Sequence, residues 1–148
     1  QVLLNLIFNA ADAMAGHGVI HLQVNWKTQL PSALILAPKP APLYVSIQVV
    51  DSGHGIAPEV LPRIFEPFFT TKAFSTRKGT GLGLTMVYEL AKDSGLGLKV
   101  DSVPDQGSTF ALILPVTEEH AAGPPPAETS PTSGNSPHQA LGSSPRVP

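Results

Sequence analysis

The sequence predicts an α+β fold, in which a mixed, mostly antiparallel sheet carries helices on one face to form a two-layer sandwich. Three observations predict it. Residues 1–15 place apolar side chains at helical spacing, residues 20–26 and 45–49 alternate apolar and polar side chains as strands do, and a second helical stretch at 82–93 precedes two further strand-like runs. The order helix, two strands, two helices, two strands is typical of an α+β domain rather than a parallel α/β one.

The first helix is expected from Gln1 to about Ala15, where Leu3, Leu6, Ile7 and Ala10 share one face, and the glycines that follow end it. The next two elements, "VIHLQVNW" and "YVSIQVVD", have the alternation of half-buried strands. We expect these two strands to pair as a hairpin, although a long connection separates them.

Later elements follow the same rules. A short helix is expected over Pro58 to Phe65, opened by its proline, and a longer helix over Leu82 to Asp93. The segments "LKVDSV" and "STFALILP" supply two more strands.

Composition bounds the function. The chain of 148 residues is 42% hydrophobic and 14% charged, which suits one globular domain, and its formal net charge of -2 excludes the basic surface of a nucleic-acid binder. The absence of cysteine excludes disulfides, zinc-thiolate sites and thiol catalysis. The longest apolar run is interrupted by Asn5 and Asn9 and is shorter than the roughly 20 residues of a membrane span. We expect a soluble, cytoplasmic chain with no membrane segment.

Two stretches depart from ordinary domain composition. Residues 27–43 form a proline-rich connection far longer than a typical loop, and residues 117–148 hold seven of the sixteen prolines but few large apolar residues. We therefore predict a domain over 1–116, truncated at its N-terminal side because the sequence begins inside a periodic segment, and a disordered tail over 117–148.

The stretch "KGTGLGLTMVYELAK" sets glycines at alternate positions directly before a helix. A dinucleotide fingerprint needs G-x-G-x-x-G after a strand, and a P-loop needs a final G-K-[ST], so neither motif fits. Glycines do let the main chain approach an anion, and the start of a helix offers unpaired N–H groups. Phosphate binding is one interpretation, and a flexible hinge is the other.

The motif "DSGHGI" ends a predicted strand, and its Asp51 offers a carboxylate acceptor beside a bare backbone. An exocyclic amine such as that of adenine would suit this acceptor. The alternative is an Asx-type turn that closes the strand.

Asn5, Asn9 and Asp12 fall on one face of the first helix, opposite its apolar face. Carboxamide oxygens on one helix face, near phosphates, can complete the coordination shell of a Mg²⁺ ion. The simpler interpretation is a polar face that contacts only solvent. A fourth motif, "RIFEPFFTTK", gathers Phe65, Phe68 and Phe69 as a hydrophobic anchor for a loop.

Together and in this order, the four motifs resemble the catalytic and ATP-binding domain of sensor histidine kinases, in the wider family that includes gyrase, a heat-shock chaperone and the mismatch-repair ATPase. "NLIFNAADAM" resembles the N box, "DSGHGI" the G1 box, "FEPFFTTK" the F box and "GTGLGL" the G2 box. The resemblance covers Gln1 to about Pro115 and implies the Bergerat-type ATP-binding fold. "FEPFFTTK" with a short lid is most similar to the nitrogen-regulation type.

The resemblance implies roles for single residues. Asn9 corresponds to the Mg²⁺ ligand, with Asn5 as a second ligand or water partner. Asp51 corresponds to the acceptor for the adenine amine, and Thr109 to the hydroxyl that backs it through water. The residues expected to bind ATP and Mg²⁺ are Asn5, Asn9, Asp51, Gly53, Gly55, Phe65, Phe68, Lys72, Arg77, Lys78, Gly79, Thr80, Gly81, Leu82, Gly83, Leu84 and Thr109.

Within these residues, Gly53 and Gly55 would let the base lie against the backbone. Gly79, Gly81 and Gly83 would form the phosphate-side hinge of a lid, with Phe65 and Phe68 as its anchor. The cations Lys72, Arg77 and Lys78 would be available to the phosphates.

One position separates the branches of the family. ATPases that resemble gyrase carry a glutamate where this chain has Asn5, and a carboxamide cannot take a proton from water near neutral pH. The resemblance therefore implies phosphoryl transfer to a histidine on a separate dimerisation domain of the full-length protein, with a response-regulator receiver domain further downstream. Such a protein could be attached to a membrane elsewhere in its chain. The alternatives are an ATPase of the same superfamily and a degenerate interaction module that binds no nucleotide.

Overall fold

The computed structural model describes residues 1–69 and 81–117. Its elements, in chain order, are α1 (Val2–Ala13), β1 (His21–Lys27), β2 (Leu43–Asp51), the 3₁₀ helix η1 (Leu61–Arg63), α2 (Gly83–Ser94), β3 (Gly97–Val103) and β4 (Gly107–Val116). The predicted order of elements is confirmed, with one change of helix type. The predicted tail, apart from Thr117, lies outside the described residues.

The helix expected over Pro58 to Phe65 is wrong in extent and type, because only the three residues of η1 are helical. The amide N–H groups of Val60 and Arg63 each donate to the carbonyl three residues earlier, at 2.9 Å. Pro62 lies inside this turn, and it has no N–H and would clash with the preceding turn of an α-helix. The segment therefore stays a single tight turn.

The sheet has the strand order β1-β2-β4-β3. The expected pairing of the first two strands is confirmed, from His21 opposite Val50 to Lys27 opposite Tyr44. Every described pairing is antiparallel, so the part of the sheet that the structure describes contains no parallel ladder. The register places Asp51 directly opposite Ser108 at one end of the sheet.

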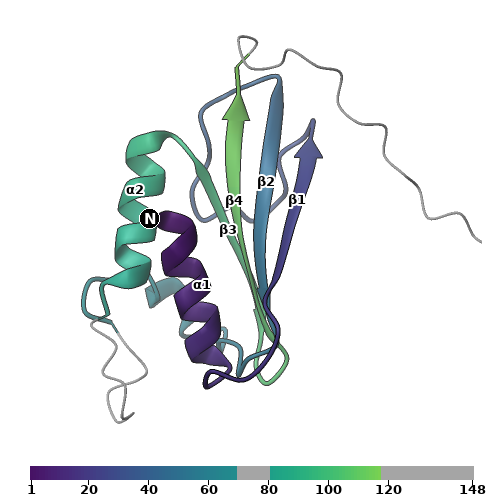
Figure 1. Ribbon diagram of the computed structural model, residues 1–148. Coiled ribbons are helices and arrows are strands. Elements are labelled where there is room, and N and C mark those ends of the chain that lie inside the picture. Colours follow the sequence, from purple (N-terminus) through teal and green to yellow (C-terminus); the bar gives the residue numbers. More distant parts are fainter. Residues whose placement is uncertain (70–80, 118–148) are drawn as a thin grey trace, which may run out of the picture.

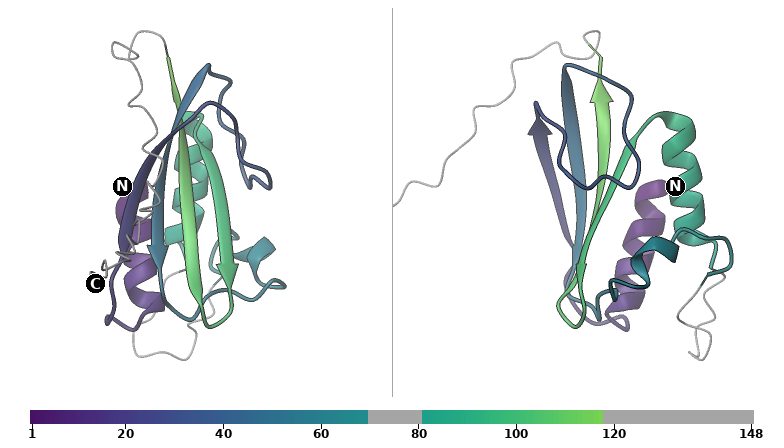
Figure 2. Two further views of the ribbon diagram at one scale, coloured as in Figure 1. Left: turned by 90° about the vertical axis from the view of Figure 1, so that its right-hand side faces the viewer. Right: turned by 180° about the vertical axis from the view of Figure 1, so that it is seen from behind.

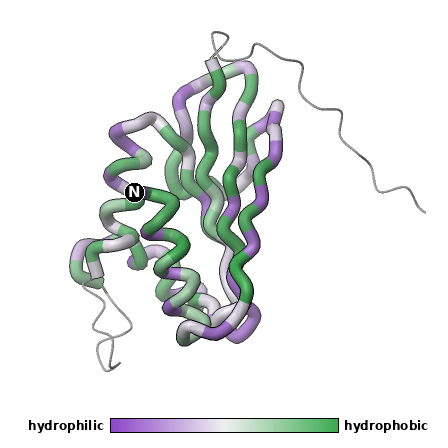
Figure 3. Tube along the Cα trace, in the orientation of Figure 1, coloured by the Kyte–Doolittle hydropathy of each residue, from purple (hydrophilic) through white to green (hydrophobic). Residues whose placement is uncertain are grey.

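Both α-helices pack on the same face of the sheet, which gives the two-layer sandwich (Figures 1 and 2). Apolar residues follow α1 and the central strands (Figure 3). The core is formed by Leu6 and Ala10 of α1, Val87 of α2, and Val49, Leu98, Phe110 and Leu112 of the strands. This core holds α1 with the face that carries Leu6 toward the sheet, so the polar face of α1 is not part of the core.

The proline-rich connection between β1 and β2 packs against the outer edge of the sheet. The Leu36 and Leu98 backbones form an isolated antiparallel bridge at β3. Pro38 is buried beside Gly97, and the Ala41 N–H donates to the Tyr44 hydroxyl at 2.9 Å. The connection thereby covers one edge of the sheet. Within the described ranges, neither helix is long and apolar enough to cross a membrane.

Candidate nucleotide-binding site

A cleft of about 490 Å³ opens at the end of the sandwich where α1 ends and α2 begins. Its walls come from α1, from the residues that follow β2, from the region of η1, from the start of α2, and from the β3–β4 hairpin. Pockets of this size hold small organic ligands, whose orientation is set by a few polar groups among apolar ones.

The wall formed by α1 carries the predicted polar residues. Asn5, Asn9 and Asp12 all line the cleft, as their shared helix face predicts, and Phe8 stands beside them. The Nδ2 atom of Asn5 is buried and has no hydrogen-bond partner among the described residues. Because an unpaired buried donor is costly, a group within the cleft would have to supply the missing acceptor.

These residues also suit the predicted cation. No group of three His, Asp or Glu side chains that could hold a metal ion occurs among the described residues. Asn5 and Asn9 instead offer carboxamide oxygens on one wall. Mg²⁺ accepts such hard oxygens and keeps several of its waters, with phosphates completing its shell. The donor set therefore fits Mg²⁺ held together with a phosphate-bearing ligand.

Asp51 ends β2 at the base of the cleft and is only 5% exposed. Its Oδ1 atom accepts hydrogen bonds from the backbone N–H groups of Gly53, at 2.9 Å, and Ser108, at 3.3 Å. Both of these hydrogen bonds fall on Oδ1. Asp51 is not itself a lining residue, but Ser108 is. The carboxylate is thus held rigidly just behind the cleft wall.

The structure places Thr109 on the face of the sheet away from the cleft. Side chains alternate across a strand, and Ser108, opposite Asp51, shares the face of the sheet that carries the cleft. Thr109 pairs with Asp101 and Val50 on the opposite face, and it does not line the cleft. Ser108 is the hydroxyl residue beside Asp51, and its Oγ lies 2.9 Å from Ser102 Oγ.

Ser102 links this hydroxyl to the rest of the wall. Its Oγ accepts a hydrogen bond from the Ile56 N–H at 2.8 Å, and lies 3.1 Å from the Gly107 carbonyl oxygen. Sequence reasoning missed both serines. The alternation of residues along β4 predicts that Ser108 and Thr109 face opposite sides of the sheet. Which of the two faces the cleft becomes clear only from the pairing of Ser108 with Asp51.

The two glycines of "DSGHGI" have packing roles. Gly55 lines the cleft with φ of 66°, and a Cβ there would lie 2.1 Å from the Val103 carbonyl oxygen. Gly53 is buried and does not line the cleft, and a Cβ on it would meet the Ala13 backbone at 2.7 Å. Both glycines therefore let this loop sit against neighbouring backbone, which positions the wall behind any ligand.

The aromatic residues divide differently from the prediction. Phe65 packs against Tyr88, with ring centroids 5.7 Å apart, which agrees with an anchor role. Phe68, also predicted as part of the anchor, has a side chain that is 74% exposed and a backbone φ of 63°. Phe69 lines the cleft instead, and the Arg63 guanidinium lies over its ring at 4.6 Å.

The start of α2 closes one side of the cleft. Gly81, Gly83 and Leu84 line it, whereas Leu82, the N-cap residue, does not. No side chain caps this end of the helix, so its first N–H groups are available to an anion. The predicted residues Lys72, Arg77, Lys78, Gly79 and Thr80 lie outside the described residues, and no Lys or Arg lines the cleft among those described.

Four apolar wall residues were not predicted as site residues. Ile56, Ala57, Val60 and Ile64 line the cleft opposite α1 and come from an irregular stretch around η1. Val60 and Ile64 fall within the helix expected over Pro58 to Phe65, but only the folded chain reveals that they share one surface with Ile56 and Ala57.

The site and fold together define a nucleotide-binding α+β domain. The family described as histidine kinase-, DNA gyrase B- and HSP90-like ATPase matches residues 1–118. The chain belongs to this family, and the ATP-binding character expected from its four motifs is confirmed.

Three known proteins show the likeness in detail. Sensor kinase CckA of Brucella abortus is 44% identical over 131 residues, which are 85% of this chain and 13% of CckA. Sensor histidine kinase ZraS of Escherichia coli K12 is 42% identical over 116 residues, 78% of this chain and 21% of ZraS. The crystal structure of full-length ShkA in complex with AMPPNP superimposes with a TM-score of 0.56 at 31% identity, covering 77% of this chain and 20% of that one.

The chain therefore spans less than a quarter of the length of these curated relatives. The comparisons support the prediction of a histidine-kinase ATP-binding domain. The nitrogen-regulation subgroup stays a prediction.

Proposed function

We propose that this domain binds Mg-ATP in the cleft and, within a longer two-component sensor kinase, donates the γ-phosphoryl group to a histidine on a separate dimerisation domain. The ATP-binding part rests on the family and on the likeness to ShkA, which was crystallised in complex with AMPPNP, a compound similar to ATP. The phosphoryl transfer rests on the names of the relatives, CckA and ZraS among them.

The observation that carries the proposal is the chemical division of the cleft. Just behind the wall at one end lies a carboxylate, Asp51, whose Oδ1 accepts hydrogen bonds from two backbone N–H groups, and its strand neighbour Ser108 lines the cleft. Another region brings Asn5 and Asn9 together with the uncapped start of α2 at Gly83. An amine-bearing ring suits the first, and phosphates with a hard cation suit the second.

When bound, Mg²⁺ would neutralise charge on the phosphate oxygens, and Asn9 and Asn5 are the residues that would hold it. The chain itself would bind and orient the nucleotide. In the transfer, the bond from the γ-phosphorus to the bridging oxygen would break, the lone pair of the unprotonated imidazole nitrogen would form the new bond to phosphorus, ADP would leave, and the proton on the other ring nitrogen would pass to water.

ATP hydrolysis as the main activity is the second candidate. The position of the family's catalytic glutamate is held by Asn5, whose carboxamide cannot accept a proton near neutral pH. Asp12 and His54 are the titratable residues that line the cleft within the described ranges. The resemblance gives neither Asp12 nor His54 the role of the base that activates water for hydrolysis. We therefore favour transfer to a protein histidine.

Titration calorimetry on this chain with ADP and with GDP, each with and without Mg²⁺, tests the proposal. Saturable ADP binding that Mg²⁺ strengthens, with little heat from GDP, is expected. A folded chain that binds neither nucleotide would instead favour the interaction-module alternative. Steady release of phosphate from ATP by the isolated domain would favour the ATPase.

The remaining predictions belong to the longer protein. They are the dimerisation domain as phosphoryl acceptor, a downstream receiver domain and the cytoplasmic location, and the disordered tail over 117–148 stays a prediction for this chain. Transfer of label from γ-³²P-ATP to a separately supplied dimerisation domain of the full-length protein, lost when its histidine is replaced, would test the first of these.

A further inference from the structure

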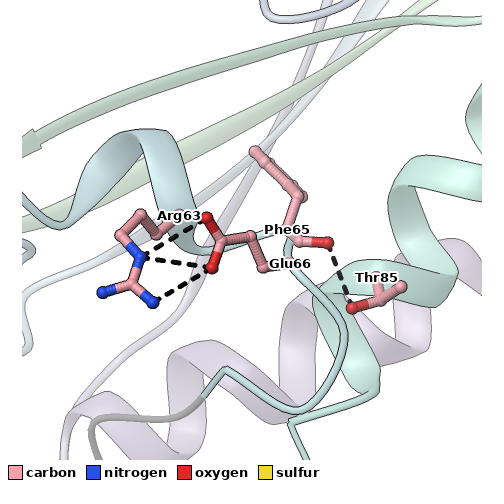
Figure 4. Close-up of polar contacts among 4 residues, drawn as sticks. All are labelled: Arg63, Phe65, Glu66 and Thr85. Atoms are coloured by element: carbon pink, nitrogen blue, oxygen red, sulfur yellow. Dashed lines mark hydrogen bonds and ion pairs between the residues drawn. The ribbon is translucent and has the colours of Figure 1, made fainter.

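The hydroxyl of Thr85 joins two parts of the cleft wall that are distant in sequence. Thr85 lies in the first turn of α2 and is half-buried. Its Oγ1 donates to the carbonyl oxygen of Phe65 at 3.1 Å (Figure 4). The same Oγ1 also lies 3.4 Å from the carbonyl oxygen of Gly81. One side chain thus links the start of α2 to the segment that follows η1.

The same two segments touch through their backbones. The Phe68 N–H donates to the Gly81 carbonyl oxygen at 3.1 Å. Gly81 has φ of 67°, and a Cβ there would lie 2.6 Å from the Phe68 carbonyl carbon. The approach is therefore close enough to require glycine. Because Phe69 and Gly81 both line the cleft, this junction sets the position of the wall.

Other side chains at the junction hold it less directly. The Arg63–Glu66 ion pair, at 3.1 Å, joins the last residue of η1 to a residue three positions later, and the two side chains are 58% and 50% exposed. An exposed pair of this kind contributes little. The rings of Phe65 and Tyr88 are in contact, and this contact has little directional preference. It therefore does not fix the position of α2 along its axis. The Thr85 hydroxyl supplies a directional bond.

We infer that Thr85 is a positioning residue for the phosphate end of the cleft. Its hydroxyl holds Gly81 and the first turn of α2 against the Phe65–Phe69 segment, so that the unpaired N–H groups at Gly83 and Leu84 point toward an anion. This inference rests on the proposed function. It requires that loss of the hydroxyl weakens binding of the phosphates and spares binding of the adenine ring, which lies toward Asp51.

Three variants of this chain test it. Thr85→Val has nearly the same shape but no hydroxyl, Thr85→Ser keeps the hydroxyl, and Thr28→Val removes a hydroxyl from an exposed segment. ADP with Mg²⁺ is titrated by calorimetry, and adenosine by competition or by amide chemical shifts. Thermal unfolding of each variant checks that it is folded.

The loss of one neutral hydrogen bond predicts that Thr85→Val weakens ADP binding by roughly three- to tenfold, while adenosine binding changes by less than about twofold. Thr85→Ser and Thr28→Val should both match the wild type. Equal losses for ADP and adenosine, or unchanged ADP affinity in folded Thr85→Val, would overturn the positioning role. Failure of the wild type itself to bind ADP would instead overturn the proposed function on which the role depends.

Discussion

Ser108 and Asp51 face each other across the β2–β4 pair, and the Ser108 N–H donates to Asp51 Oδ1 at 3.3 Å. The Gly53 N–H donates to the same oxygen at 2.9 Å, so two backbone groups hold the carboxylate in one orientation. This pair of residues joins the end of the sheet to the cleft, and the first two predictions concern it.

Asp51→Asn should weaken ADP binding at least about tenfold, because a hydrogen bond to a charged acceptor contributes about 1.5 to 3 kcal/mol and an amide group can present a donor where an acceptor is needed. Calorimetry with ADP measures the change. Asp93→Asn, which removes a charge from the exposed end of α2, is the matched control and should bind as the wild type does. A loss below threefold in a folded Asp51→Asn chain would rule out the adenine contact.

Ser108→Ala and Thr109→Ala form a natural pair, since the two residues are adjacent and lie on opposite faces of β4. Ser108→Ala should weaken ADP binding by roughly two- to tenfold, because it removes a hydroxyl that lines the cleft. Thr109→Ala should leave the affinity within about twofold. The reverse ranking would restore Thr109 as the hydroxyl that serves the nucleotide.

Asn9→Ala should remove most of the gain in ADP affinity that Mg²⁺ provides, while ADP binding in EDTA stays close to that of the wild type. The reason is that Asn9 lines the cleft with a carboxamide oxygen suited to Mg²⁺. Calorimetry with and without Mg²⁺ measures the difference. Asn25→Ala, in the exposed strand β1, serves as the control. A full Mg²⁺ effect in Asn9→Ala would exclude Asn9 as a ligand.

Gly55→Ala should destabilise the fold by ~3 kcal/mol or more, because the residue has φ of 66° and its new Cβ would collide with the Val103 carbonyl oxygen. Gly16→Ala is the control, since φ is 79° there but nothing lies within 4 Å of the added Cβ. Backbone strain alone should cost Gly16→Ala about 1 to 2 kcal/mol. Chemical denaturation measures both, and equal losses would show that the contact with Val103 is unimportant.

Much of this molecule could be predicted from local patterns. The buried face of α1, with Leu6 and Ala10, follows from helical spacing, and the pairing of β1 with β2 follows from alternation. The shared position of Asn5, Asn9 and Asp12 on one cleft wall follows from the same helix geometry. These features depend on residues close together in the chain, for which the period of the backbone is sufficient.

Other features depend on contacts between distant segments, and only the folded chain settles them. Whether Ser108 or Thr109 faces Asp51 depends on the register of β4 against β2, which a pattern within β4 cannot reveal. Phe68 turns outward and Phe69 inward because the Phe68 backbone meets Gly81, beyond residues 70–80. The role inferred for Thr85 arises in the same way, since its partner Phe65 is twenty residues earlier. A period along the chain determines which face a residue occupies on its own element, whereas packing between elements determines what that face meets.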